Sequence, residues 1–390
     1  MIISLWLIMQ KSCRVIISTP VLLLGGTEMQ MLMLVEALLS SDYDVIINCY
    51  YEYDKRIISL FESKGAHVFC HDLKRSDGLL KLLSALAKYY RKRRPDIVHV
   101  QYLAPGLVPI VAARLAGIRT VFATVHIAGS VAYGRKAKFL LRLAAKFCTA
   151  FFCVSKGVEE FWFGDSELFD PANVNKGRKH FTVYNAIDTF TIANTVNAVD
   201  RHKMKETLGI AGCPAIGIVG RLAHQKGHII LIDAMVEVIR EFPDVVLMII
   251  GEGPDRQRLE KKAIALYINN NILWMGAQPQ NKVFEFYGIM DIFVMPSLYE
   301  GFGLTAAEAM AASVPVVGTN VEGLSEVIED GVSGYLIPAG NSQALGDAVI
   351  KLLKDPQKAK VFGQNGCKRA ERLFPLARFN ASMIGIYDNF

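Results

Sequence analysis

The sequence lacks the long hydrophobic runs that integral membrane proteins need. Its apolar N-terminal stretch, Met1–Met9, is far shorter than the ~20 residues that cross a bilayer. No basic segment precedes this stretch and no small-residue cleavage site follows it, so a secretory signal is not expected. We interpret it as an extra leader ahead of the first strand, or as a start codon placed too early. The sequence therefore predicts a protein that is soluble or peripheral to a membrane.

Paired cysteines are absent too. The seven cysteines are scattered, odd in number and contain no C-x-x-C pair. This pattern excludes a zinc ribbon and a disulfide framework, and it fits reduced thiols in the cytoplasm.

The chain also has little excess charge. Its 43 basic and 37 acidic side chains give a net charge of +6, too weak to indicate nucleic-acid binding but suited to anionic substrates or an anionic membrane surface. Apolar residues make up 52% of the 390 residues, enough for a large core, and this length suggests two or three domains.

Short β-rich runs alternate with longer helical patterns, which is typical of parallel βαβ units. In the first half we expect helices at 29–40 and 79–93 and strands at 14–18, 44–48, 67–70, 96–100, 120–124, 151–155 and 182–184. Residues 185–213 carry a polar helix and are interpreted as a linker. The second half repeats the alternation, with strands at 215–219, 245–250, 272–275, 292–295, 315–318 and 335–337. The predicted domains are 1–200 and 201–373.

The functional interpretation of the chain is built around one stretch, Pro296–Ala311. A buried strand ends at Pro296, a loop with two glycines follows, and an Ala-rich helix begins near Thr305. A helix N-terminus after a strand presents unpaired N–H groups and a partial positive charge, and phosphates bind there. Two carboxylates, Glu300 and Glu308, bracket this loop.

The spacing of these glutamates, with Gly-Phe-Gly-Leu after the first, resembles the E-x7-E motif of family-4 retaining glycosyltransferases of the GT-B fold. The resemblance implies an α/β protein with two Rossmann-like, doubly wound parallel-sheet domains facing across a cleft, and a last helix, 374–390, that crosses back to the first domain. It places Glu300 near the transferred sugar and Glu308 at the ribose, with the amides of Phe302, Gly303, Leu304 and Thr305 cradling phosphate. The alternative is a strand–loop–helix with two surface glutamates.

A second strand–loop–helix puts Arg221 and Lys226 beside another helix N-terminus. Cations there can stabilise the charge that grows on a departing diphosphate. The segment Gly220–Gly227 resembles the family's G-R-L-x-x-x-K-G motif, whose Arg and Lys bind the donor diphosphate. We accordingly expect no metal or other cofactor. Two solvated surface cations are the alternative.

Further correspondences are weaker. Gly25 and Gly26 follow the first strand, like the family's glycine-rich loop, although an ordinary turn would look the same. Thr124–His126 resembles the family's T-x-H, whose histidine approaches the donor sugar. Asn185–Asp188 resembles N-x-x-D, with Ala186 in place of the usual glycine. The resemblance also places base contacts near Gly276 and Ala277.

Two sequence patterns are typical of metal sites, but we interpret neither of them as one. Asp42–Asp44 spells D-x-D, yet it lies at a helix–strand junction at the end of the strand opposite the expected site, so we interpret it as a turn. His224 and His228 are four residues apart without a recognisable third ligand, and Lys226 between them already has a phosphate role.

Two basic runs, Lys88–Arg94 and Arg135–Arg142, leave two interpretations open. They are solvated helix ends, or they attract anionic lipid, worth about 1 kcal/mol per charge. Both lie in the first domain, where the family keeps its acceptor site.

The sequence therefore predicts a retaining glycosyltransferase that moves a sugar from a UDP- or GDP-sugar to a glycan or lipid-linked acceptor in the cytoplasm, without nucleic acid as a partner. No side chain is an evident nucleophile on the sugar, which favours front-side attack over a covalent intermediate. A nucleotide-sugar 2-epimerase and a non-catalytic nucleotide-sugar-binding subunit remain alternatives.

Overall fold

The computed structural model describes residues 13–101, 106–127, 134–175 and 177–390. The apolar leader Met1–Met9 lies outside these residues. The chain divides into two compact units. Unit 1 comprises Met1–Tyr184 and Phe379–Phe390, and unit 2 comprises Asn185–Arg378.

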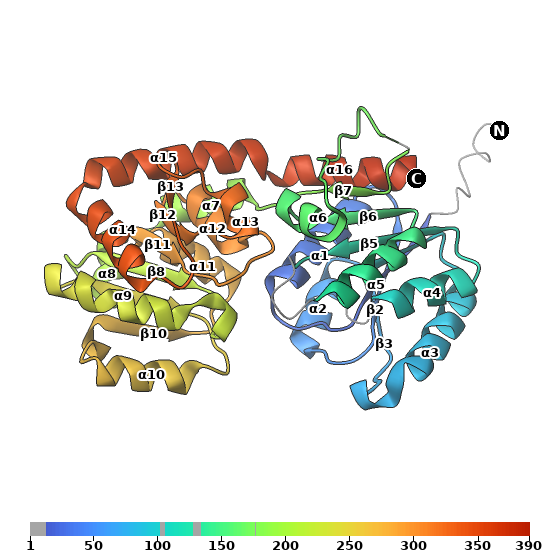
Figure 1. Cartoon of the computed structure of the whole chain (residues 1–390), viewed down its shortest axis with the longest axis horizontal. Coiled ribbons are helices and arrows are strands. Elements are labelled where there is room, and N and C mark those ends of the chain that lie inside the picture. The colour runs from blue at the N-terminus through green and yellow to red at the C-terminus, as the bar shows by residue number, and fades with distance from the viewer. Residues whose placement is uncertain (1–12, 102–105, 128–133, 176) are drawn as a thin grey trace, which may run out of the picture. The chain divides into compact units, whose positions relative to one another are not determined.

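Unit 1 is built on a seven-stranded parallel sheet with the order β3-β2-β1-β4-β5-β6-β7, drawn in blue to green in Figure 1. Its strands are β1 (Arg14–Thr19), β2 (Asp44–Cys49), β3 (His67–Cys70), β4 (Ile97–Gln101), β5 (Thr120–Val125), β6 (Ala150–Cys153) and β7 (His180–Thr182). Its helices are α1 (Gly26–Leu39), α2 (Lys55–Ser63), the 3-10 turn η2 (Arg75–Asp77), α3 (Gly78–Arg93), α4 (Leu107–Leu115), α5 (Arg135–Lys146) and α6 (Lys156–Phe163).

Unit 2 is built on a six-stranded parallel sheet with the order β10-β9-β8-β11-β12-β13. Its strands are β8 (Ala215–Val219), β9 (Val246–Ile250), β10 (Ile272–Gly276), β11 (Ile292–Met295), β12 (Val316–Thr319) and β13 (Gly334–Ile337). Its helical segments are α7 (Thr189–Ala198), α8 (Arg201–Thr207), η3 (His224–Lys226), α9 (His228–Glu241), α10 (Arg256–Ala265), η4 (Asn269–Asn271), α11 (Gln280–Tyr287), α12 (Leu304–Ala311), α13 (Glu322–Val327), α14 (Ser342–Lys354) and α15 (Pro356–Leu373).

The central strands are buried on both faces, which explains why they read as continuous apolar runs. In β1, Val15, Ile16 and Ile17 are completely buried between β2 and β4. In unit 2, β8 pairs with β9 and β11 in the same way, and β11 is buried throughout. The predicted parallel alternation is therefore confirmed in both units.

Three predicted boundaries differ from the structure. Helix α1 begins at Gly26 instead of near Met29, so the two glycines form the helix start. Strand β7 lies at His180–Thr182, two residues before the expected run. The units divide at Tyr184 and Asn185, before residue 200, because α7 of the supposed linker packs against α11 and α12 of unit 2.

The last helix, α16 (Leu376–Asn389), places its C-terminal part in unit 1. Phe379, Met383 and Ile386 are buried, and the Tyr387 hydroxyl lies 2.7 Å from Nδ1 of the buried His99 in β4. The predicted helix at 374–390 is therefore present and is anchored in unit 1 from Phe379 onward. Among the described residues, no helix is long and apolar enough to cross a membrane.

Candidate functional site

The candidate site lies where the strand order of unit 2 reverses. Strands β8 and β11 are neighbours in the sheet but far apart in sequence, so the chain leaves them in opposite directions. Their carboxyl ends lead into Gly220–Gly227, here called the β8 loop, and Pro296–Gly303, the β11 loop. Ligands of doubly wound sheets bind at this topological switch point. The two motifs predicted from the sequence are thus brought to one edge of one sheet.

Hydrogen bonds tie the two loops together. The Leu298 amide donates to the Gln225 carbonyl at 2.8 Å, and the Gln225 side-chain amide donates to the Tyr299 carbonyl at 3.1 Å. Gly227 has φ +68°, and a side chain there would collide with the Pro296 carbonyl. Glycine at this position therefore permits both the left-handed turn and the close approach of the two loops.

The charged groups of these loops pair across the junction. Lys226 Nζ donates to Glu300 Oε2 at 2.6 Å, with both side chains only partly exposed. The hydroxyl of buried Ser297 donates to the same oxygen at 3.3 Å. Arg221 is exposed and forms no ion pair with a described residue. The predicted site cations thus differ, because Lys226 is held in place and Arg221 remains available to an anion.

Helix α12 begins directly after the β11 loop. Gly303 caps it with φ +104° and without a side-chain cap bond. The Ala306 and Ala307 amides donate to the Gly303 carbonyl at 3.1 Å. The preceding amides, those of Leu304 and Thr305, have no partner within the helix. Phe302 is buried edge-to-face on Phe374, with 5.0 Å between ring centroids, and this contact fixes the loop at the predicted phosphate cradle.

Glu308 lies in α12, eight residues after Glu300 of the β11 loop, and is partly buried. The Tyr287 hydroxyl donates to Glu308 Oε2 at 2.9 Å. Burial raises the pKa of Glu308 to about 7, against opposing hydrogen bonds from Tyr287 and Gln280 that favour the charged form. A carboxylate poised in this way can accept hydrogen bonds from hydroxyl groups.

A third loop, Gly251–Gly253, was missed by the sequence reasoning. It follows β9, and its amide at Gly251 donates to the carbonyl of Gly276 at 2.8 Å. A side chain at Gly253 would collide with the backbone of Leu222 in the β8 loop. The sequence pattern that could have identified this loop is two glycines and a proline directly after the end of β9. Gly276, predicted near the base, therefore adjoins this loop, with Ala277 exposed beside it.

The predicted site residues of unit 1 follow β1 and β5. Gly25 caps α1 in an extended conformation, and a side chain there would approach the Glu28 carboxylate to 2.8 Å. His126 Nε2 lies 2.8 Å from Oε1 of Gln101, which is buried at the end of β4. Burial lowers the pKa of His126 to about 4, so the ring is neutral at physiological pH. Gln101 was not predicted, because nothing in the local sequence announces the contact.

The residues of the two metal-like patterns have different surroundings. Asp44 accepts from Arg14 at 2.6 Å, the Tyr43 hydroxyl donates to Asp388 at 2.7 Å, and Asp42 occupies a left-handed turn position at φ +61°. His224 is exposed in η3 while His228 is buried in α9. The turn interpretation of Asp42–Asp44 agrees with these contacts, and the two histidines belong to different helical segments and differ in exposure.

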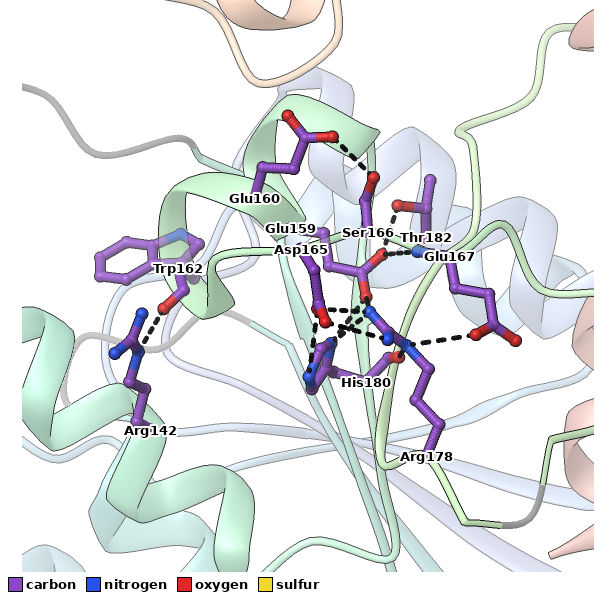
Figure 2. Close-up of polar contacts among 10 residues, drawn as sticks. All are labelled: Arg142, Glu159, Glu160, Trp162, Asp165, Ser166, Glu167, Arg178, His180 and Thr182. Atoms are coloured by element: carbon purple, nitrogen blue, oxygen red, sulfur yellow. Dashed lines mark hydrogen bonds and ion pairs between the residues drawn. The ribbon is translucent and has the colours of Figure 1, made fainter.

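Unit 1 contains another group of ligand-type side chains, Glu159, Asp165 and His180, whose ligand atoms lie within 4.8 Å of one another (Figure 2). Arg178 already lies among them, with Nη2 at 2.8 Å from Glu159 Oε1 and 2.7 Å from Asp165 Oδ1. Glu159 is completely buried and also accepts from the Thr182 hydroxyl. The guanidinium supplies the positive charge that these carboxylates need, so the cluster ties α6 to β7.

Two family models match the chain. The one described as Glycosyl transferases group 1 matches residues 200–369, and the one described as Glycosyltransferase Family 4 matches residues 24–165. The first covers the β8 loop, the β11 loop and Gly251–Gly253, and the second covers Gly25, Gly26 and His126. The predicted site residues therefore all lie inside matched segments.

Similar proteins with curated names are glycosyltransferases. The chain is 29% identical to an alpha-D-kanosaminyltransferase of Streptomyces kanamyceticus over 57% of each chain. It is 28% identical to an N-acetyl-alpha-D-glucosaminyl L-malate synthase of Bacillus anthracis over 73% of this chain and 72% of that protein. Most of the curated relatives are matched over about half of their own length.

Solved structures match nearly the whole chain. Anabaena HepE, solved with UDP and glucose, superimposes with a TM-score of 0.81 at 19% identity, over 97% of this chain and all of that one. A sucrose-phosphate synthase of Thermosynechococcus elongatus gives 0.78 at 19% identity, over 97% and 98% of the two chains. At this identity the likeness shows the shared fold, GT-B, with its two Rossmann-like domains.

Proposed function

Because the chain belongs to the family-4 glycosyltransferases of the GT-B fold, we propose that it transfers a sugar from a nucleotide-sugar donor to a glycan or lipid-linked acceptor, with retention of anomeric configuration. The observation that carries this proposal is the Lys226–Glu300 pair, held beside the start of α12 at the switch point of unit 2. A UDP- or GDP-linked donor fits, and the HepE complexes with UDP and UDP-glucose favour the uridine form.

The donor diphosphate is the part that the β8 and β11 loops suit best. Cleavage of the sugar–phosphate bond leaves growing negative charge on the nucleoside diphosphate. Arg221, Lys226 and the first-turn amides of α12 present positive charge and N–H donors to that anion. Each such donor typically contributes about 3–4 kcal/mol of transition-state stabilisation. These groups can supply the electrostatic role without a bound metal.

The carboxylates would recognise the neutral parts of the donor. Glu308 accepts hydrogen bonds from the ribose hydroxyls, as an acidic residue does in other doubly wound nucleotide sites. When the diphosphate takes over Lys226, Glu300 is released to bind hydroxyls of the transferred sugar. The ion pair therefore keeps both side chains near their working positions before the donor arrives.

The scarcity of nucleophilic side chains bears on how retention would be achieved. Without donor, Glu300 accepts hydrogen bonds from Lys226 and Ser297, and Glu308 accepts one from Tyr287. In the proposal both carboxylates then bind hydroxyl groups of the donor instead of attacking the anomeric carbon. Neutral His126 can exchange hydrogen bonds with sugar hydroxyls but carries no charge to attack the anomeric carbon. We therefore favour entry of the acceptor hydroxyl on the leaving-group side, with the departing diphosphate taking its proton.

Membrane association is part of the proposal, and the two basic runs differ in their support for it. In α3, Tyr89 and Tyr90 are buried under the cations, which fits a solvated helix end. In α5, Phe139 and Leu140 are 67% and 51% exposed among lysines and arginines. Exposed apolar side chains beside cations are typical of segments that lie on an anionic bilayer, so α5 is the proposed contact to the cytoplasmic face of a membrane.

The test is to incubate the purified protein with a panel of UDP- and GDP-sugars, and to select the donor by the rise in melting temperature. Incubation with that donor should release nucleoside diphosphate, faster when a glycan or lipid-linked acceptor is added, and Glu300→Ala should abolish this. Appearance of an epimerised donor without acceptor would instead establish the epimerase. No stabilisation by any member of the panel would contradict the proposal.

A further inference from the structure

Tyr287, the last residue of α11, contacts the candidate site, and no sequence motif predicts this contact. Its side chain is completely buried. The hydroxyl lies 2.9 Å from Glu308 Oε2 and 3.3 Å from the Thr305 carbonyl oxygen. Both acceptors belong to α12, so a single phenol from a neighbouring helix reaches the backbone and the carboxylate of the helix that opens the candidate phosphate cradle.

The phenol acts as a donor in this contact. Burial, together with the nearby Glu308 carboxylate, raises the pKa of Tyr287 well above its ordinary range, so the hydroxyl keeps its hydrogen. It has one hydrogen for two acceptors, and an ionised carboxylate is the stronger acceptor. The shorter distance is the one to Glu308. The hydroxyl therefore holds the Glu308 carboxylate, and the Thr305 carbonyl is the lesser partner.

The ring that carries this hydroxyl is itself fixed. It packs edge-to-face on Phe293 of β11, with 5.7 Å between centroids, and lies near-parallel to Phe284 at 6.5 Å. Glu308 has a flexible side chain that would lose rotamer freedom on binding a ligand. A rigid donor from α11, together with Gln280 of the same helix, removes most of that freedom beforehand.

We propose that Tyr287 is a positioning residue for the donor, which orients Glu308 so that its carboxylate receives the ribose hydroxyls of a nucleoside diphosphate. The inference rests on the proposed function, because it takes Glu308 to be the ribose contact. It adds a residue outside the loops that would affect, through Glu308, how well the site discriminates ribose from deoxyribose. Tyr287 itself does not touch the nucleotide.

The experiment measures the affinity of the full chain for UDP and 2′-deoxy-UDP, and in parallel for GDP and 2′-deoxy-GDP, by calorimetry. The variants are Tyr287→Phe, Gln280→Ala and Glu308→Gln, with Tyr267→Phe as the matched control, since Tyr267 is 95% exposed in unit 2. We expect the wild type and the control to prefer the ribose nucleotide by about tenfold or more. Tyr287→Phe should reduce this preference to about two- to threefold through loss of UDP or GDP affinity alone.

Further outcomes separate positioning from folding. Gln280→Ala should lower the preference in the same direction but less, and Tyr287→Phe should add little to Glu308→Gln in the double variant, because both act on one contact. An unchanged ribose preference in Tyr287→Phe would overturn the inference, as would equal weakening of both nucleotides, which is the signature of general damage. Failure of the wild type to bind any of the four nucleotides would instead remove the proposed function, and the inference with it.

Discussion

The carboxyl edges of the two sheets carry different chemistry. In unit 2 the edge presents formal charges, with Arg221 and Lys226 as cations and Glu300 and Glu308 as carboxylates. In unit 1 the predicted site residues are neutral, namely Gly25, Gly26 and a His126 ring that burial keeps uncharged at physiological pH. Exposed Leu23 and Leu24 adjoin these glycines.

This contrast indicates which interactions each unit would supply in the proposed reaction. Stabilising a departing diphosphate needs positive charge, and the cations among the predicted site residues, Arg221 and Lys226, both lie in unit 2. Recognising hydroxyl groups or an apolar acceptor needs shape and neutral hydrogen bonds, which unit 1 supplies. Substitutions should therefore cost most where they remove a charge from unit 2 and less where they remove a neutral contact from unit 1.

The largest effect is expected from Lys226→Ala. Loss of one cation at the departing diphosphate should lower kcat by about 10²–10³-fold, or about 3–4 kcal/mol, while the melting temperature changes little. Lys354→Ala is the matched control, since Lys354 pairs with Glu241 on the surface of unit 2 at 2.7 Å. Steady-state kinetics on the selected donor would check this. A Lys226→Ala enzyme as active as the Lys354→Ala control would contradict the claim that charged groups of unit 2 matter most for transfer.

Glu308→Gln should change how stability depends on pH. The folded pKa of Glu308 is about 7, raised from an ordinary value of 4.5. Between these values the folded chain binds more protons than the unfolded chain, so the free energy of unfolding falls as pH rises from about 4.5 to 7. Discounted for partial exposure, this loss is about 2 kcal/mol.

Chemical unfolding at pH 4.5 and pH 8 would measure that loss. Glu308→Gln should resemble the wild type at pH 4.5 and be the more stable of the two at pH 8, because the substituted side chain never ionises. Glu326→Gln provides a control elsewhere in unit 2. A Glu308→Gln variant that is less stable than the wild type at pH 8 would show that the ionised carboxylate is well accommodated by its surroundings.

A smaller effect is expected from unit 1. His126→Ala should lower kcat/KM by about tenfold, because it removes a neutral hydrogen-bonding group worth about 1.4 kcal/mol. Since the pKa of His126 is about 4, the wild-type rate should show no ionisation of this ring between pH 6 and 8. A pH–rate profile and the kinetics of His126→Ala and Gln101→Ala would test this. A loss as large as that of Lys226→Ala would remove the contrast between the sheet edges.

The smallest effect concerns α5. Phe139→Ser should weaken binding to vesicles of anionic lipid about five- to tenfold, because it removes an exposed apolar side chain that would enter the bilayer surface. Lys88→Ser in α3 should change binding about fivefold or less, in line with the loss of one charge. Sedimentation with anionic and neutral vesicles would measure both. Equal binding of wild type and Phe139→Ser would assign both basic runs to solvated helix ends.

The carboxyl edge of the unit 2 sheet was easier to predict from the sequence than the other contacts of the site, because the sequence patterns that indicate it are local. A strand that stops at Pro296 and a glycine turn before a helix can be read within one short segment, and so can Lys226 beside Gly227. The contacts of Tyr287 with Glu308 and of Gln101 with His126 depend on how separate elements pack, and neither leaves a local pattern. The same reason explains the domain boundary, since α7 looks like a linker until its packing against α11 and α12 is known.

The most direct test of the central claim is a titration with UDP and GDP in the presence of EDTA. If the cations and helix amides of unit 2 hold the diphosphate, one nucleotide will bind without divalent metal, and Lys226→Ala will weaken it by at least tenfold while Lys354→Ala leaves it unchanged. Binding that vanishes in EDTA and returns with Mg²⁺, or that is equally strong in Lys226→Ala, would contradict the account.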